Sequence, residues 1–452
     1  MDERGLAALV ARHSPSEVVD ALLALPVDQR RALAPIAARL WRAVQGGRVL
    51  NDWLLLVPGV GTTKESSSFG RRWRAQQARL SLAVLCLCPV DQARRVGWFG
   101  AGVSDDLLRR VLLARDQAWR DAWLRHRLRE DFSGLSWATV RGLIRDGICV
   151  RPSDEAAFAG YLRLLVDQLS PGVPRQGNPY RPPSAGLLAD PDLLEDEVWR
   201  LFDTDTRAFD DSWLRRSPRC PADYESWSEA LLRLAGDGRL DRQRLLDASL
   251  AGLWKSADNG VVAGYHRLHA RLSPAAAEVD VREAAYRELL GHRSGQVVVF
   301  ALRQMTQIAN RRSLLSVPML AAMQPVFGLP AKTPALAALR LLRRLLRSEW
   351  SADQDPATRD ATHAVLVAAL RHRASEVQRV AAELLGEHAA AGGGVPAAAV
   401  DELAGEVSPP AQQLLAALVA ERAPCAPLSR AAVAADAIAP PAGDAAAVST
   451  VP

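Results

Sequence analysis

Three stretches in the second half of the chain carry the same helical pattern of small and branched apolar residues. They lie at residues 297–302, 336–342 and 377–385. Aligned with one another, the stretches match Val297, Ala301 and Leu302 to Leu336, Leu339 and Leu342, and again to Val377, Ala381 and Leu384. A period near forty residues is typical of helix pairs that cannot bury their apolar face alone and therefore stack on their neighbours. The pattern predicts an α-solenoid, which offers a surface rather than an enclosed pocket.

Composition supports a helical fold. The chain has 452 residues, too many for one compact core, so we expect several domains or one extended array. Leu, Ala and Arg dominate and β-branched runs are scarce, which favours helix over sheet. Ser14 and Glu17 flank Pro15 in the pattern of a capping box, which predicts a helix start. Residues 53–57 alone fit either a short buried strand or a helix end.

The chain divides into four parts. We expect a helical N-terminal region over residues 1–170, with helices that include 71–88, 116–130 and 153–169. Residues 171–186 contain five Pro and three Gly, which predicts a linker or surface loop. The predicted solenoid spans 187–421. Residues 422–452 hold twelve Ala and five Pro without a periodic face, so we expect a disordered tail.

Cysteine usage and hydropathy indicate a cytoplasmic protein. The five cysteines are odd in number and irregular in spacing, so they form no disulfide framework. Cys86 and Cys88 follow an apolar run and are expected to be buried thiols. No hydrophobic signal core and no apolar run near twenty residues is found, so we expect no membrane association.

Motifs for catalysis, cofactors or metals are incomplete. Residues 59–64 resemble a phosphate-binding loop, but Thr63 stands where that loop requires glycine. His266 and His269 could share a helix face, yet no cysteine or acidic pair completes a metal site. The acidic residues of 203–211 fail the calcium-loop pattern, because Ala208 replaces its glycine. We therefore expect a protein that is not an enzyme and holds no cofactor or metal.

Charge is distributed unevenly along the chain. Residues 71–151 contain sixteen Arg against eight acidic residues, whereas 190–211 contain nine acidic residues against two Arg. One expected helix interleaves arginines with Trp119 and Trp123, and the arginines are Arg115, Arg120, Arg125, Arg127 and Arg129. Such a helix could bind nucleic acid, because its arginines could pair with phosphates and its tryptophans could stack on bases. Alternatively, the tryptophans form a buried stripe and the arginines a solvated face, some pairing with acidic helices. We favour the second interpretation; the same face would also suit an acidic protein partner.

A central segment, from about Asp223 to Leu302, carries a recognisable combination of short sequence motifs. They are Gly238–Arg242, Leu245–Leu250, His266–His269, Leu272–Pro274 and Tyr286–Leu290. The segment resembles an uncharacterised family of HEAT-like bacterial proteins, common in actinomycetes and known only as a domain of unknown function. The resemblance implies a HEAT-like fold and transfers no catalytic residue. Members are often encoded near a SWIM-type zinc-binding protein and a MoxR-type AAA ATPase with a von Willebrand A partner, which implies a scaffold or adaptor.

The expectation is therefore an all-α protein with a HEAT-like α-solenoid of antiparallel helix pairs. Its expected function is that of a cytosolic, non-enzymatic scaffold that binds a protein partner not identified by the sequence. The alternative is a HEAT-like module that binds nucleic acid through residues 71–151.

Overall fold

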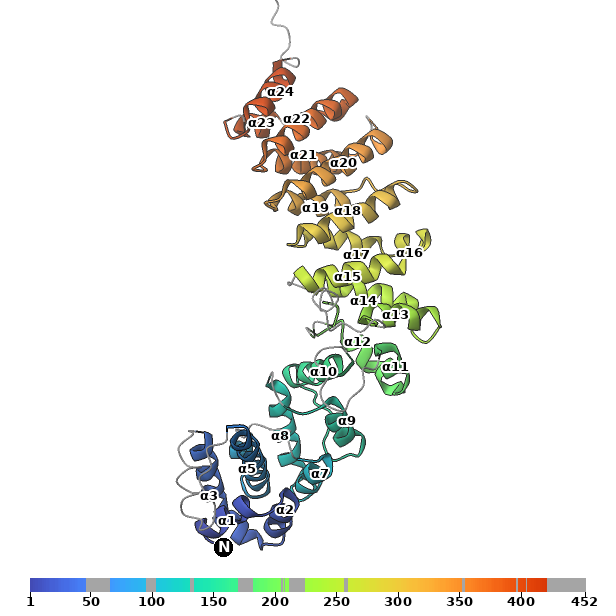
Figure 1. The fold of residues 1–452 in the computed structure, drawn as a ribbon. Coiled ribbons are helices and arrows are strands. Elements are labelled where there is room, and N and C mark those ends of the chain that lie inside the picture. Colours follow the sequence, from blue (N-terminus) through green and yellow to red (C-terminus); the bar gives the residue numbers. More distant parts are fainter. Residues whose placement is uncertain are drawn as a thin grey trace, which may run out of the picture. The chain divides into compact units, whose positions relative to one another are not determined.

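The computed structural model describes residues 1–45, 66–94, 103–130, 134–169, 182–204, 206, 208–210, 224–255, 259–351, 354–395, 397–403 and 405–420. Within these ranges the regular secondary structure is entirely helical, which confirms the all-α prediction (Figure 1). Residues 53–57, the loop 59–64 and the predicted tail 422–452 lie outside the described residues. No helix in the described ranges has the length and apolarity needed to cross a membrane.

The chain forms two compact units, Met1–Pro274 and Ala275–Pro452, which we call unit 1 and unit 2. The division after Pro274 lies inside the range 187–421 that we expected to form a single array. Each unit has its own buried core and is described separately.

The first helices of unit 1 pack around one long helix, α5, which contacts α1, α2 and α3. Their bounds are α1 (Glu3–Arg12), α2 (Pro15–Leu23), α3 (Val27–Gln45) and α5 (Ser66–Leu87). The predicted capping box is present at the start of α2. Ser14 Oγ accepts from the Glu17 amide at 3.3 Å, and Glu17 Oε2 accepts from the Ser14 amide at 2.7 Å. This reciprocal pair satisfies two amides that a helix start otherwise leaves without partners.

The next helices position the charged residues of unit 1. They are α6 (Val90–Ala93), α7 (Asp105–Leu113), α8 (Gln117–Arg129), α9 (Trp137–Arg145) and α10 (Glu155–Leu169). α10 packs closely on α8 at Gly160, where an added Cβ would lie 1.6 Å from the Leu128 carbonyl oxygen. Only glycine permits this approach of two backbones. The predicted apolar stripe of α10 is buried, as Phe158, Leu162, Leu165 and Leu169 all show.

Unit 1 continues with short helices and ends with a three-helix group. The bounds are α11 (Pro183–Leu188), the π-helical turn η1 (Leu193–Glu197), α12 (Val198–Arg200), α13 (Trp227–Gly236), α14 (Arg242–Lys255) and α15 (Asn259–Leu272). α11 lies partly within 171–186, where we expected only a linker or loop. Proline is tolerated in its first turn because amides there have no intrahelical acceptor. Residues 170–181 lie outside the described ranges.

Unit 2 consists of two rows of helices. The odd row is α17 (Glu283–Glu288), α19 (Val317–Met323), α21 (Pro356–Leu370) and α23 (Ala397–Leu403). The even row is α18 (Gly295–Ala309), α20 (Lys332–Glu349), α22 (Ser375–His388) and α24 (Pro409–Ala420). Successive members of each row contact one another, and α17 and α21 also contact α18 and α22 (Figure 1). Short elements complete the unit: α16 (Ala276–Val281), η2 (Leu289–Gly291), η3 (Gln324–Gly328) and η4 (Ala389–Gly393).

The even row repeats one set of buried positions. Matching buried residues are Val297, Pro334 and Val377, then Ala301, Ala338 and Ala381, then Met305, Leu342 and Leu385. The helices thus share a register in which α20 follows α18 by 37 residues and α22 follows α20 by 43. The predicted correspondence paired Val297 with Leu336, Ala301 with Leu339 and Leu302 with Leu342, which is two, one and three residues away from this register. The buried position of α20 that matches Val297 is Pro334 in its first turn, and an apolar pattern of Leu and Ala does not reveal a proline as a core residue.

A repeated turn precedes two of these helices and supports the corrected register. His292 Nδ1 accepts from the Ser294 amide at 3.0 Å, and His372 Nδ1 accepts from the Ala374 amide at 3.0 Å. Because Nδ1 accepts, Nε2 of His372 carries the proton and donates to the Leu329 carbonyl at 3.1 Å. The same His-Arg pair therefore shapes the turns before α18 and α22.

Candidate functional site

The five arginines predicted as a binding surface do not gather on one exposed face of α8. Arg115 is half-buried: its Nε donates to the Leu85 carbonyl at 2.8 Å, and its guanidinium lies 4.6 Å from the centre of the Trp119 ring. Arg127 is 1 % exposed and pairs with Glu130. Burial lowers the pKa of both guanidinium groups. These two arginines therefore belong to the interior of unit 1.

Arg115 lies before the start of α8, and the three remaining arginines, which lie within α8, differ in exposure. Arg120 is half-buried and donates to Gln117 Oε1 at 2.6 Å. Arg125 is exposed and donates to the Asp121 carbonyl, while the exposed Arg129 pairs with Asp154 at 2.9 Å. Only Arg125 and Arg129 thus lie on the solvent side. Trp119 and Trp123 form a buried stripe, being 8 % and 1 % exposed, as the favoured interpretation predicted. That interpretation was wrong for Arg127, which it placed on a solvated face.

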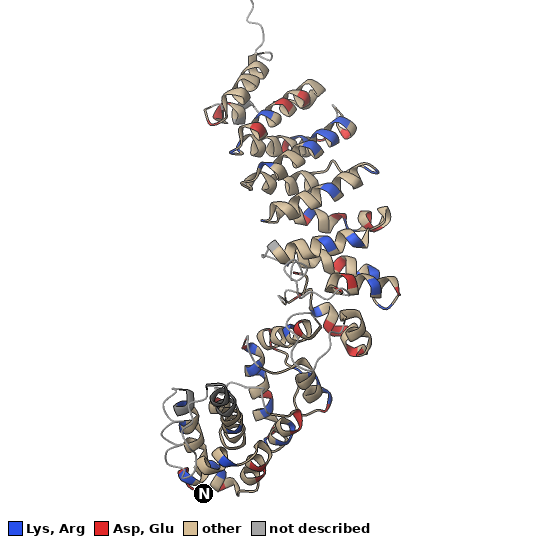
Figure 2. Ribbon diagram, in the orientation of Figure 1, with Lys and Arg blue, Asp and Glu red and all other residues tan. Residues whose placement is uncertain are grey.

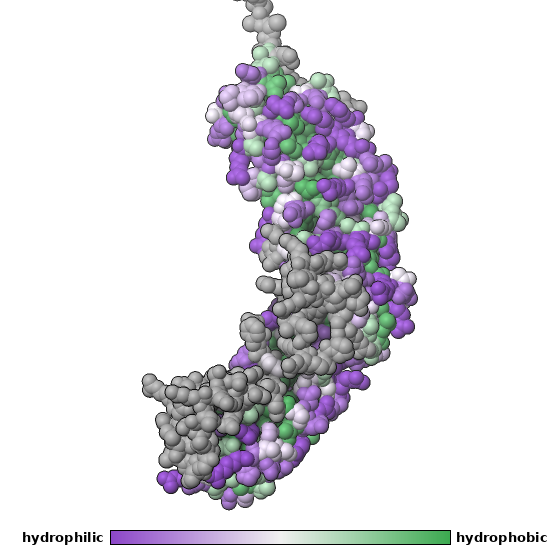
Figure 3. Space-filling view, in the orientation of Figure 1, coloured by the Kyte–Doolittle hydropathy of each residue, from purple (hydrophilic) through white to green (hydrophobic). Residues whose placement is uncertain are grey.

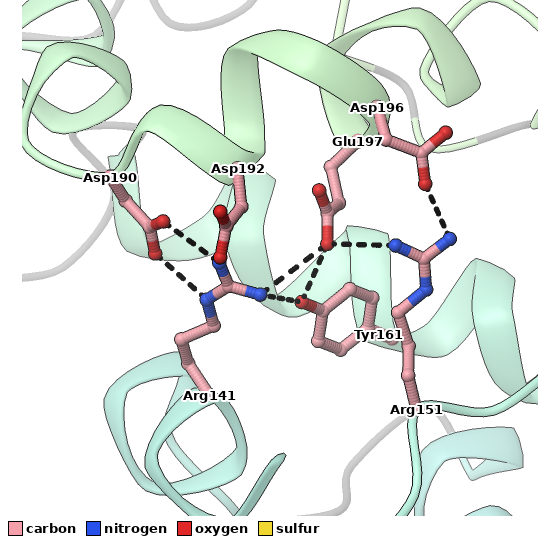
Figure 4. Close-up of polar contacts among 7 residues, drawn as sticks. All are labelled: Arg141, Arg151, Tyr161, Asp190, Asp192, Asp196 and Glu197. Atoms are coloured by element: carbon pink, nitrogen blue, oxygen red, sulfur yellow. Dashed lines mark hydrogen bonds and ion pairs between the residues drawn. The ribbon is translucent and has the colours of Figure 1, made fainter. Parts of the chain in front are cut away.

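A cluster of charged residues in unit 1 lies where α9 meets the segment before α12 (Figure 4). Arg141 of α9 donates from Nε and Nη2 to the two oxygens of Asp190, each at 2.8 Å. Its Nη2 also donates to Asp192 at 2.9 Å, and its Nη1 lies 3.4 Å from Glu197 Oε1. Bidentate pairing of this kind combines strength with a defined orientation, because the guanidinium fork matches the carboxylate. We call the residues around Arg141 the Arg141 network.

Tyr161 and Arg151 complete the Arg141 network. The Tyr161 hydroxyl accepts from Arg141 Nη1 at 3.3 Å and donates to Glu197 Oε1 at 3.2 Å. Arg151 donates to the same Glu197 oxygen at 3.3 Å and pairs with Asp196 (Figure 4). Tyr161 is 0 % and Glu197 1 % exposed, whereas the side chain of Asp192 is 71 % exposed. The network therefore extends from the core to the surface.

The π-helical turn explains how several carboxylates reach one arginine. In an α-helix, residues five apart point in different directions, because each residue turns the chain by about 100°. A π-helical turn closes with an i to i+5 bond and brings residues five apart onto one side. Asp192 precedes this turn and Glu197 ends it, so both reach Arg141.

The electrostatics of the Arg141 network favour a structural clamp. Burial and the charge of Glu197 raise the pKa of Tyr161, so its hydroxyl stays protonated and donates. Hydrogen bonding to Asp190 raises the pKa of Arg141, which remains charged. The basic region 71–151 and the acidic region 190–211 thus pair with each other here. The uneven charge was the signal in the sequence, but it did not reveal which residues meet.

The described cysteines are buried, and so are four of the histidines: His269, His292, His372 and His388. Cys86 and Cys88 are buried, as predicted, and this burial raises the pKa of the Cys86 thiol to about 12 and of the Cys88 thiol to about 11. His269 is 0 % exposed and its Nδ1 lies 2.8 Å from Ser249 Oγ. Among the described residues, no group of three His, Cys, Asp or Glu side chains has the geometry to hold a metal.

A second group of charges lies on the even row of unit 2 and was not singled out from the sequence. Lys332 of α20 pairs with Glu376 of α22 at 2.8 Å, and Arg347 pairs with Glu387 at 3.0 Å. Arg343 lies between them and reaches Glu387 at 3.3 Å. Blue bands on α20 face red bands on α22 in Figure 2. We call these pairs the α20–α22 ladder. An alignment of α20 with α22 in the corrected register would have placed these opposite charges near one another and so predicted the α20–α22 ladder.

Comparison with known proteins identifies a family but no function. A family model described as a domain of unknown function (DUF6493) matches residues 3–330. No curated protein and no solved structure matches the chain.

Proposed function

This chain belongs to the family described as a domain of unknown function (DUF6493), and we propose that it is a non-enzymatic scaffold or adaptor that binds another protein in the cytosol. The observation that carries the proposal is the recurrence of buried positions in α18, α20 and α22. Each helix buries one face against its row and its partner, and its opposite face is left for solvent or a partner. Repeated outward faces of this kind form the binding surfaces of stacked-helix proteins.

We further propose that the helix pairs form a HEAT-like α-solenoid. Successive contacts within the odd and even rows of unit 2 support this architecture. The family resemblance of residues 223–302 suggests the biological setting, in which the chain serves a MoxR-type ATPase system as its adaptor. In that setting the ATPase would provide the chemistry and this chain the docking surface.

Nucleic-acid binding through residues 71–151 has less support. Arg115 and Arg127 are engaged inside unit 1, and Arg141 and Arg151 are paired with acidic residues. A duplex-binding surface needs several phosphate contacts from exposed cations, and α8 offers Arg125 and Arg129.

The test is affinity purification of the tagged full chain from its natural host after mild crosslinking. A parallel purification with the tag alone identifies proteins that are recovered non-specifically. A scaffold recovers one protein in reproducible, near-stoichiometric amount, and nuclease treatment leaves that recovery unchanged. Recovery of no specific protein, or recovery that depends on nucleic acid, contradicts the proposal.

A further inference from the structure

In the even row of unit 2, the junction of α20 with α22 has paired charges and the junction of α18 with α20 has none among the described residues. At the junction of α20 with α22, the α20–α22 ladder pairs Arg343 and Arg347 with glutamates. In the shared register, the positions of Arg343 and Arg347 are occupied in α18 by Thr306 and Asn310. The junction of α18 with α20 therefore has neutral residues where the next junction has arginines.

Three arginines lie at this neutral junction. Arg340 and Arg344 of α20 occupy the positions that Glu383 and Glu387 occupy in α22, and Arg303 of α18 matches Arg340. Arg344 lies about 100° around the helix from Arg343, on the side away from α22. All three arginines are exposed. Within the described ranges no carboxylate lies within ion-pairing distance of them, and Arg340 donates only to the Leu336 carbonyl of its own helix at 3.2 Å.

An apolar residue accompanies the arginines on each helix. Val299 lies one turn before Arg303, and Leu336 lies one turn before Arg340, at matching positions. Both are half exposed, so the surface combines apolar contact area with positive charge. Figure 3 shows hydrophobic residues interrupting the hydrophilic surface in this part of unit 2. We call Val299, Arg303, Leu336, Arg340 and Arg344 the α18–α20 face.

The charges beside the α18–α20 face limit what it can bind. The matching positions of α22 are Arg379, Glu383 and Glu387, so the excess of positive charge ends there (Figure 2). A nucleic-acid backbone carries a continuous row of charges and would meet these glutamates. A short acidic segment with apolar residues on the same side would contact the arginines and the apolar pair together.

We propose that the α18–α20 face binds an acidic amphipathic segment of a partner protein. The carboxylates of that segment pair with Arg303, Arg340 and Arg344, and its apolar side chains cover Val299 and Leu336. The proposal rests on the scaffold function above and assigns that function a surface and a partner chemistry.

The test measures fluorescence anisotropy of a labelled helical peptide rich in Glu and Leu, titrated with the full chain. Arg340→Glu turns attraction into repulsion and is expected to weaken binding at least about tenfold at low salt. The matched control is Arg125→Glu on α8. Arg125 is also exposed and also donates Nε to the carbonyl four residues earlier, at 3.3 Å. Raising the salt should weaken binding of the unmodified chain, because exposed charges are screened beyond about 10 Å at 0.1 M.

Three results would overturn the assignment: an unchanged affinity in Arg340→Glu, an equal loss in Arg125→Glu, or tighter binding of a DNA duplex than of the peptide with the same dependence on Arg340. Two further outcomes distinguish failure of this surface from failure of the scaffold function. A cellular partner that Arg340→Glu still recovers leaves the scaffold intact and refutes this surface. Peptide binding through Arg340 without any cellular partner supports the surface and contradicts the scaffold.

Discussion

Arg141 in unit 1 and Arg340 in unit 2 both project from amphipathic helices, but their surroundings differ completely. Arg141 is 8 % exposed and pairs with Asp190, Asp192 and Glu197. Arg340 is exposed and donates only to its own helix, as far as the described residues show. A local excess of arginine therefore does not identify a binding surface. What matters is which arginines the fold leaves without a carboxylate.

The two environments also differ in energetic consequence. Removing one member of a buried charge network leaves its partners desolvated and unpaired, which is far costlier than losing an exposed pair. The Arg141 network should thus control the stability of unit 1. The α18–α20 face should affect stability little and binding strongly.

The largest expected effect comes from Arg141→Met. The substitution removes the bidentate partner of Asp190 and one of the three partners of the buried Glu197, and it should lower the free energy of unfolding of unit 1 by about 3–5 kcal/mol. Denaturation followed by tryptophan fluorescence measures it, because eleven of the twelve tryptophans precede residue 275. Arg303→Met is the control and should change stability by less than about 0.5 kcal/mol. An equal loss of unfolding free energy in the two variants would contradict the difference in energetic consequence between the Arg141 network and the α18–α20 face.

Alkaline pH should destabilise unit 1 through its buried thiols. The pKa of Cys86 is raised, so its stabilising contribution is complete below the ordinary thiol pKa and declines as pH rises toward about 12. In that window the free energy of unfolding falls by about 1.4 kcal/mol per pH unit for each such thiol. Denaturation at several pH values above 8 measures the slope, which Cys86→Ala should reduce. Fast labelling of Cys86 by a thiol reagent in the folded protein would argue against this account.

Tyr161→Phe tests the centre of the Arg141 network with a smaller change. It removes one hydroxyl that accepts from Arg141 and donates to Glu197, at an expected cost of about 1–2 kcal/mol. The ring remains packed against Trp137, with centroids 4.6 Å apart, so the core shape is kept. The same fluorescence-detected denaturation applies. A neutral result would indicate that the arginines hold Glu197 without help from the hydroxyl.

Glu387→Gln in the α20–α22 ladder should affect stability less than the changes in the Arg141 network. Exposed pairs contribute about 0–1 kcal/mol, so unfolding of unit 2 should change by no more than that. The substitution releases Arg347 and removes a repelling charge near the α18–α20 face. Binding of the acidic peptide should therefore strengthen a few-fold, measured by anisotropy. Weaker binding would place the peptide elsewhere.

Helix positions were predictable because their signals are local. The expected helices 116–130 and 153–169 agree closely with α8 and α10, and the capping box at Ser14 is present. Caps and apolar periodicity act within a few residues, so they are readable without knowledge of the fold. The helix that begins at Pro183 was not predictable from the proline content of 171–186, because proline breaks a helix in its interior but is tolerated in its first turn.

The sequence indicated a recurring apolar pattern in the segments that form α18, α20 and α22, but not the register in which their buried positions match. Leucine and alanine occupy many positions around the circumference of α20. Several alignments of α20 with the other helices therefore fit the apolar pattern about equally well. Burial of Pro334 and exposure of Leu336 select one of them. The α18–α20 face follows only from that register, because a shift of two residues moves the arginines out of alignment.

The amino-acid sequence by itself determined that this chain is helical and where many of its helices begin and end. These properties depend on neighbours within a turn or two. The tertiary structure alone decided that Arg141 is engaged inside unit 1 while Arg340 faces solvent. Arg141 and Glu197 are 56 residues apart, and only the packing of α9 and α10 against the π-helical turn brings them together.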